Sequence, residues 1–100
     1  MNEDDFLKSL IVDFVQESND YIKKVEENII DYENNHSDEI KRKILMDLHS
    51  IKGSAQAADL ETIADEVHQM ENIVGQENSP IDNWLNILDN ISKHIKNIKV

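Results

Sequence analysis

The 100-residue sequence contains no cysteine, only two glycines and one proline, and 5% aromatic residues. The absence of cysteine excludes a disulfide framework, a thiolate zinc site and a cysteine nucleophile, and it fits a reducing compartment such as the cytoplasm. With so little glycine and proline, the chain lacks the turn residues that a many-stranded sheet needs. We therefore predict an all-α protein.

Long hydrophobic runs are missing as well. No apolar stretch approaches the roughly 20 residues that span a bilayer. Residues 1–6 (MNEDDF) are acidic, unlike the basic start of a signal peptide. We expect a soluble, cytoplasmic protein that does not enter a membrane.

Basic residues are scarce: 10 Lys and Arg stand against 21 Asp and Glu, and the formal net charge is -11. Proteins bind nucleic acids largely through Lys and Arg, which displace counterions from the phosphates, and anionic membrane surfaces attract the same residues. The composition therefore argues against both as partners. We expect most of the acidic charge to coat solvated helix faces.

Apolar residues recur three, four and seven positions apart, the spacing of one helix face. The segments with this spacing are residues 4–34, 38–57, 60–74 and 81–100. Such short connections join antiparallel neighbours, so the pattern predicts an up-down four-helix bundle, one domain over residues 1–100. The last segment is still periodic at Val100, which fits a domain cut from a longer protein.

Residues with capping chemistry mark the ends of these segments. Ser37 or Asp38 is predicted to cap the second helix. Asp59 is placed to cap the third helix, and Gly75 is predicted to end it in the left-handed conformation. Before the fourth helix, Ser79-Pro80 is typical of an N-cap followed by proline at the first helical position.

The stretch around His49 carries the most chemical information. On a helix, His49 shares a surface with Lys52 and Gly53, three and four positions later. Glycine inside a helix costs about 1 kcal/mol relative to alanine, so the run Gly53-Ser54-Ala55 is a poor choice for stability alone. Its use would be access for another protein's active site, while Lys52 neutralises the oxygens of a transferring phosphoryl group.

The third segment offers a complementary pair, His68 and Glu71, one turn apart and off its apolar stripe. If the helices are antiparallel, Glu71 can face His49. A carboxylate that accepts a hydrogen bond from one ring nitrogen fixes the tautomer and makes the other nitrogen a better nucleophile.

Each of these residues also has a plain structural reading. His49 alone would be a tolerated boundary residue, Lys52 a surface lysine, and His68 with Glu71 an ordinary pair within one helix. A metal site formed by the two histidines and Glu71 would need a complete coordination set, which makes it a minor alternative. Two further histidines, His36 and His94, have no obvious partner, and we take them as surface residues.

Residues 49–55 (HSIKGSA) resemble the signature of histidine phosphotransfer domains, in which the phosphorylated histidine is followed by two variable residues, lysine, glycine and small residues. Residues 68–72 (HQMEN) are similar to the third-helix motif of the amino-terminal phosphotransfer domain of chemotaxis histidine kinases. The likeness extends over essentially the whole chain. It leaves two alternatives open: a separate phosphotransfer protein, and the N-terminal domain of a longer histidine kinase.

The resemblance implies a role for each site residue. His49 would accept the phosphoryl group, Glu71 would hold its imidazole, and Lys52 and His68 would complete the polar network. Gly53 would keep the approach open for partners. The implied partners are an ATP-dependent kinase domain and a response-regulator receiver domain with an acceptor aspartate. Magnesium and ATP belong to those partners, so the domain is expected to need no cofactor and to have no self-sufficient enzymatic activity.

The sequence departs from the family pattern at Asp59, where a second glycine is usual, and Gln56 stands where a smaller residue is common. Asp59 and the acidic charge favour one rival, a bundle that binds signalling partners without being phosphorylated. A second rival is a plain helical interaction module, in which the small residues only permit close helix packing. That module would bury Gly53 against a neighbouring helix, whereas a phosphotransfer domain would leave it facing solvent.

Overall fold

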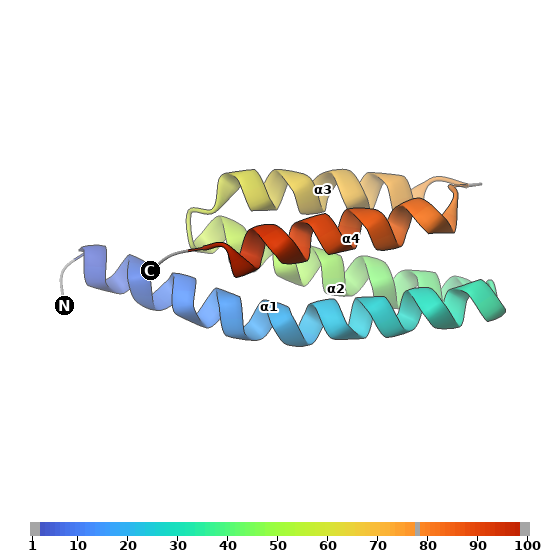
Figure 1. Ribbon diagram of the computed structural model, residues 1–100, viewed down its shortest axis with the longest axis horizontal. Coiled ribbons are helices and arrows are strands. Elements are labelled where there is room, and N and C mark those ends of the chain that lie inside the picture. The colour runs from blue at the N-terminus through green and yellow to red at the C-terminus, as the bar shows by residue number, and fades with distance from the viewer. Residues whose placement is uncertain (1–2, 78, 99–100) are drawn as a thin grey trace.

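The structure is a computed structural model that describes residues 3–77 and 79–98. The described residues form four helices and no strand: α1 (Glu3–Asn34), α2 (Asp38–Ala57), α3 (Glu61–Gly75) and α4 (Ile81–Lys96). As Figure 1 shows, they run side by side, with α1 and α3 each packed against both α2 and α4. The predicted antiparallel four-helix bundle is therefore confirmed.

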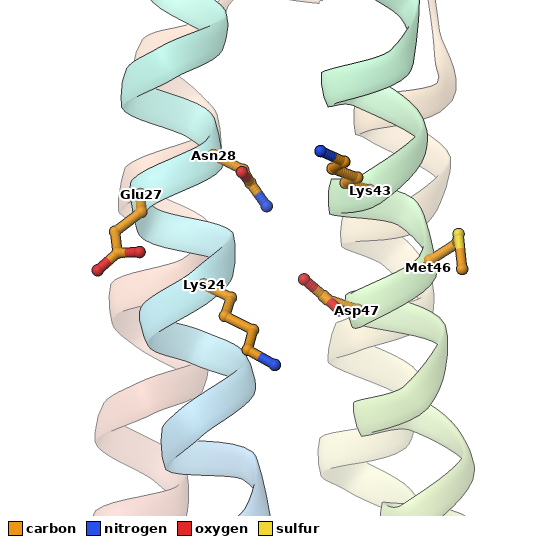
Figure 2. Close-up of a pocket in the computed structure, with 6 residues that line it drawn as sticks. All are labelled: Lys24, Glu27, Asn28, Lys43, Met46 and Asp47. Atoms are coloured by element: carbon orange, nitrogen blue, oxygen red, sulfur yellow. The ribbon is translucent and has the colours of Figure 1, made fainter.

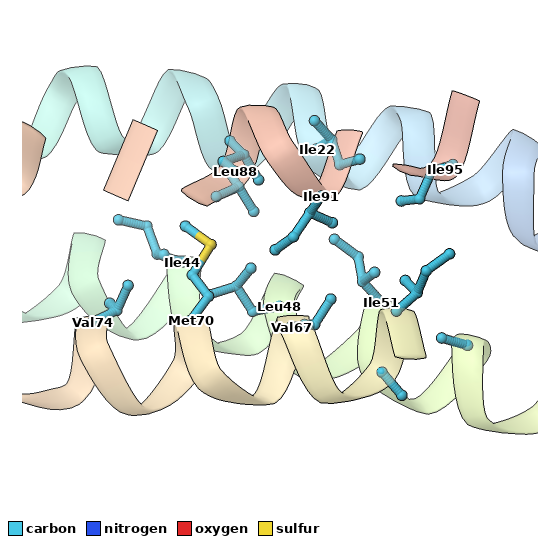
Figure 3. Packing of buried hydrophobic residues seen from close by; sticks show 14 of the residues in the cluster. Ile22, Ile44, Leu48, Ile51, Val67, Met70, Val74, Leu88, Ile91 and Ile95 are labelled. Carbon is cyan, nitrogen blue, oxygen red and sulfur yellow. The ribbon is translucent and has the colours of Figure 1, made fainter. Parts of the chain in front are cut away.

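The core is built from the apolar stripes of all four helices (Figure 3). Its largest fully buried side chains include Trp84, Phe14, Leu48, Ile51 and Met70. Burying a side chain of this size contributes roughly 1.5–3 kcal/mol, so these positions fix how each helix is rotated about its own axis. Since Leu48 and Ile51 point into the core, the intervening part of α2 must turn outward.

Helix α2 begins as predicted. Ser37 is its N-cap, and the Ser37 hydroxyl oxygen accepts a hydrogen bond from the Glu39 N–H at 3.2 Å. Asp38 is the first residue of the helix and not its cap. The Ser37 side chain therefore satisfies one of the free N–H groups at the N-terminus of α2.

The prediction that Asp59 caps α3 is wrong, because Asp59 belongs to the end of α2. Its φ is 60°, in the left-handed region. The Asp59 N–H donates to the Gln56 carbonyl at 3.1 Å, and the Leu60 N–H donates to the Ala55 carbonyl at 2.8 Å. These two bonds form a Schellman motif, which satisfies the last carbonyls of a helix and usually has glycine at the left-handed position. Leu60 is the N-cap of α3 and provides no side-chain hydrogen bond.

Two more boundary predictions are corrected. Gly75 is the last residue of α3 and does not have a positive φ; the helix ends because Gln76 turns to extended backbone. Helix α4 begins at Ile81 with Pro80 as N-cap, so Ser79 does not cap it. The Ser79 hydroxyl instead accepts a hydrogen bond of 2.8 Å from the Trp84 indole, which gives the buried ring its polar partner. A third correction concerns the end of this helix, which was predicted to continue through Ile98 toward Val100: α4 ends at Lys96 with Asn97 as its C-cap, and Val100 lies outside the described residues.

Candidate functional site

His49 lies on the outer side of α2. Its neighbours Leu48 and Ile51 are buried, and this leaves the imidazole pointing away from the core, with 73% of the side chain exposed. A macromolecule can therefore reach the ring without any change in the bundle.

Glu71 of α3 faces α2 at the level of His49. Glu71 Oε1 lies 3.0 Å from Lys52 Nζ, and the side chains of Glu71 and Lys52 are only 17% and 16% exposed. The contact is an ion pair without aligned hydrogen-bond geometry, since Oε1 is buried and accepts no hydrogen bond. The pair joins α2 to α3 and holds a carboxylate charge beneath the imidazole.

The second Glu71 oxygen is directed at His49. His49 Nδ1 lies 3.9 Å from Glu71 Oε2, about 1 Å longer than a hydrogen bond between these atoms. The carboxylate faces Nδ1 without a hydrogen bond, so Glu71 does not lock the ring in this state. Since Nδ1 is the nitrogen nearest the carboxylate, Nε2 is the nitrogen left for a reaction partner.

His68 lies on the exposed face of α3. Within the described residues, no hydrogen bond or ion pair joins it to His49 or to Glu71. The structure thus brings together three of the four residues predicted to form the polar network, and His68 stands apart from them.

Gly53 and Gln56 are both exposed on α2, beyond His49. A Cβ added at Gly53 would meet nothing within 4 Å. Gly53 therefore does not permit close helix packing, which is what the interaction-module reading required. A larger side chain at this position would instead project into the space that a partner of His49 must enter.

Sequence reasoning missed the partners of two histidines that we took as isolated surface residues. His94 Nδ1 of α4 lies 2.7 Å from Glu66 Oε2 of α3, a hydrogen bond between helices. His36 stacks on Tyr32, with 4.9 Å between the ring centroids. Predicting the His94–Glu66 pair requires the register of α3 against α4, which the sequence does not specify.

A cavity of about 250 Å³ opens between α1 and α2 (Figure 2). Its lining residues are Lys24, Glu27, Asn28, Lys43, Met46 and Asp47. Partial burial raises the pKa of the Asp47 carboxyl above its ordinary range, and the Lys24 charge opposes this effect. Lys24 itself lies over the Tyr21 ring, 5.6 Å from its centroid.

Among residues 3–77 and 79–98, no group of three or more His, Cys, Asp and Glu side chains is arranged to hold a metal ion. None of the helices in this part of the chain combines the length and apolar character needed to cross a membrane.

Comparison with known families agrees with this geometry. The family model described as Hpt domain matches residues 9–99, nearly the full length of the chain. The chain therefore belongs to the Hpt domain family, whose members have a histidine phosphotransfer role in phosphorelays. No curated protein and no solved structure gives a significant match.

Proposed function

We propose that His49 accepts a phosphoryl group from an ATP-dependent histidine kinase domain and passes it to an aspartate of a receiver domain. The observation that carries this proposal is the arrangement at the α2–α3 contact, where a 73% exposed imidazole stands over the nearly buried ion pair of Glu71 and Lys52. Family membership supports the same role. The domain acts as substrate and relay, and its partners provide ATP, magnesium and most of the catalytic groups.

The chemistry uses the two ring nitrogens for different tasks. The Nε2 lone pair attacks the γ-phosphorus of ATP, and the bond to the bridging oxygen breaks with its electron pair leaving on ADP. Nδ1–H faces the Glu71 carboxylate across 3.9 Å in the free domain; in the reaction it closes this gap and donates to the carboxylate, whose negative charge offsets the positive charge that develops on the ring. In the second step an aspartate oxygen of the receiver attacks phosphorus, and the electron pair of the N–P bond returns to Nε2.

Lys52 has a double role in this proposal. In the free domain it holds the Glu71 carboxylate, 3.0 Å away, in position below the imidazole. Because Lys52 follows His49 by one helical turn, its positive charge also lowers the cost of bringing the phosphoryl oxygens into an acidic protein during transfer. His68, exposed and apart from Glu71, contributes to this network only if a partner or a rotation of its side chain brings it closer.

A finer assignment rests on residues 68–72 (HQMEN). Their likeness to the chemotaxis type supports the proposal that this chain is the phosphotransfer domain of a chemotaxis histidine kinase acting in the cytoplasm. Loss of chemotaxis in a strain with His49→Gln at the chromosomal locus would support this assignment. Normal swimming responses in that strain would contradict it.

The rival function is partner binding without phosphorylation. Asp59 was its main support, but Asp59 has the left-handed φ of 60° that a glycine would adopt, so the turn before α3 keeps its shape. The retention of His49, Glu71 and Lys52 in contact weighs against the rival, because binding alone does not require this set.

The deciding experiment is acid-labile labelling of the purified domain by a panel of histidine kinases with ATP, comparing the unmutated chain with His49→Gln. We expect label only on the unmutated chain, and we expect it to leave when a receiver domain is added. Label that persists in His49→Gln would assign the acceptor elsewhere. An unlabelled wild-type domain that still binds receivers would establish the rival function.

A further inference from the structure

Helix α3 directs one glutamate at each of its two neighbours. Glu71 meets His49 of α2, and Glu66, five residues earlier, meets His94 of α4. Five residues correspond to about 140° of rotation around a helix, so the two carboxylates leave α3 on different sides. Because α1 and α3 each pack against both α2 and α4, the helices that carry the two histidines lie diagonally across the bundle (Figure 1).

The second pair has the closer contact. His94 Nδ1 lies 2.7 Å from Glu66 Oε2, whereas His49 Nδ1 lies 3.9 Å from Glu71 Oε2. An ionised carboxylate only accepts hydrogen bonds, so Nδ1 of His94 carries the proton and the lone pair of the neutral ring is on Nε2. The nitrogen that attacks phosphorus is therefore already defined at His94 before any partner binds.

The other histidines of the described residues lack this arrangement. His36 stacks on Tyr32. His68 is exposed and forms no hydrogen bond or ion pair with a carboxylate in residues 3–77 and 79–98. Both are therefore reference histidines, since they show how an imidazole reacts without a carboxylate to hold it.

A small molecule can reach the His94 ring. The His94 side chain is 54% exposed, and that of Glu66 is 25% exposed. The two side chains line a surface hollow of about 460 Å³ between α3 and α4. The other lining residues are Gln69, Ile87, Asn90 and Ile91. The hollow thus combines an oriented imidazole with the side-chain amides of Gln69 and Asn90, whose N–H groups are donors of the kind that bind phosphoryl oxygens.

We propose that His94 is a second phosphoryl acceptor, loaded by small donors with a labile phosphoryl group, of the phosphoramidate and acyl phosphate class. The Nε2 lone pair attacks phosphorus, and the bond from phosphorus to the leaving group breaks with its electron pair on the departing ammonia or carboxylate. The Nδ1 proton stays in its hydrogen bond, and the Glu66 charge offsets the positive charge that develops on the ring.

The local charge favours this reaction more than the net charge of the chain does. Helix α4 is the only described helix with basic residues in its last turn, where Lys93 and Lys96 flank His94. They lower the electrostatic cost of bringing an anionic donor to an acidic protein. The inference goes beyond the proposed function and does not depend on the role of His49.

The first test uses the His49→Gln chain, in which the proposed kinase site is absent. The chain is incubated with phosphoramidate at neutral pH, and the label on each remaining histidine is located by mass spectrometry under non-acidic conditions. We expect His94 to be labelled about fivefold faster than His36 or His68, as a charge-assisted hydrogen bond to the ring would produce. Equal rates at the three histidines would overturn the proposal.

Glu66→Gln, added to this chain, keeps the size of the side chain and removes its charge. We expect the labelling rate of His94 to fall about fivefold, while His36 and His68 react as before. Asp65→Asn is the matched control, because it removes a charge from the adjacent exposed residue of α3 and should leave the rate at His94 unchanged. An unaltered rate in Glu66→Gln, or an equal fall in Asp65→Asn, would contradict a role for the Glu66 carboxylate.

Nitrogen NMR of the histidine rings tests the geometry without any substitution at Glu66. We expect the neutral His94 ring of the unmutated chain to be the Nδ1–H tautomer, and Glu66→Ala to give a mixture of tautomers. An Nε2–H tautomer in the unmutated chain would overturn the proposal even if the variants proved unstable.

A histidine kinase with ATP separates the two sources of phosphoryl groups. We expect the kinase to label the unmutated chain at His49 alone, since a kinase bound at the exposed face of α2 does not reach α4. Kinase label at His94 would contradict its assignment to small donors. The two proposals fail separately: unselective labelling by phosphoramidate leaves kinase labelling of His49 untouched, and a missing kinase label at His49 leaves the phosphoramidate result at His94 untouched.

Discussion

The Lys52 ammonium lies 3.0 Å from Glu71 Oε1, and both side chains are nearly buried between α2 and α3. Removing one partner of such a pair leaves a desolvated charge without compensation. We expect Lys52→Met to lower the free energy of unfolding by about 1–3 kcal/mol. Urea unfolding would measure this loss. Adding Glu71→Gln to Lys52→Met should restore part of the lost free energy of unfolding. If the double variant instead loses as much stability as the two single variants together, the pair is not coupled.

Glu71→Gln should slow phosphorylation of His49. The amide can still approach Nδ1 but has no charge to offset that of the reacting ring, and we expect a rate about tenfold lower, equivalent to roughly 1.4 kcal/mol in the barrier. The rate of labelling by phosphoramidate measures the effect without a kinase. Glu66→Gln is the matched control, because it makes the same change beside His94 and should leave the labelling of His49 unaltered.

Asp59 occupies the left-handed position of a Schellman motif at φ 60°. Glycine adopts this conformation without the steric cost that a Cβ imposes. We expect Asp59→Gly to raise the free energy of unfolding by about 0.5–1 kcal/mol, with phosphotransfer to a receiver preserved. Asp59→Ala, which keeps the Cβ but loses the polar side chain, should be less stable than wild type. A stabilising alanine would show that strain at this turn is not the dominant effect.

The His94–Glu66 hydrogen bond of 2.7 Å ties α4 to α3. We expect a coupling energy of about 0.5–1.5 kcal/mol between the two side chains, as for other partly exposed charge-assisted pairs. A double-mutant cycle of Glu66→Ala and His94→Ala, followed by thermal unfolding, gives this energy directly. Additive effects of the two substitutions would mean that the contact adds nothing to stability.

The ionisation of Asp47 makes the free energy of unfolding depend on pH. Burial raises its pKa above the ordinary value of 3.8, so near and above that pH the folded protein binds more protons at this group than the unfolded chain does. Stability contributed by the group is therefore present at low pH and lost as pH rises through the folded pKa.

We expect Asp47→Asn to be slightly more stable than wild type at pH 7, with the difference vanishing below pH 4. Asp31→Asn, on an exposed residue of α1, is the control for the loss of one charge. Urea unfolding of both variants at each pH would decide, and equal behaviour of the two would contradict the assignment.

Much of the fold was predictable because its signals are local. The apolar stripe of residues 38–57 predicted the bounds of α2 without error, and Ser37 caps it as a short polar residue before such a stripe should. The wrong predictions, at Asp59, Gly75, Ser79 and the C-terminal end of α4, all fall at helix ends. At these positions the alternatives differ by one or two backbone angles, and a distant contact decides between them: Trp84, for example, takes the hydroxyl that would otherwise cap α4.

The sequence by itself determined the helices, the face of α2 that carries His49, and the presence of a lysine and a small residue beside it, because helical periodicity relates residues that are near in the chain. Tertiary structure alone decided how the α2 and α3 faces meet. It placed Glu71 closer to Lys52 than to His49, left His68 outside the network and paired Glu66 with His94. Those distances follow from packing of Leu48, Ile51 and Met70 in the shared core, which sets rotation and register between helices to within a fraction of a turn.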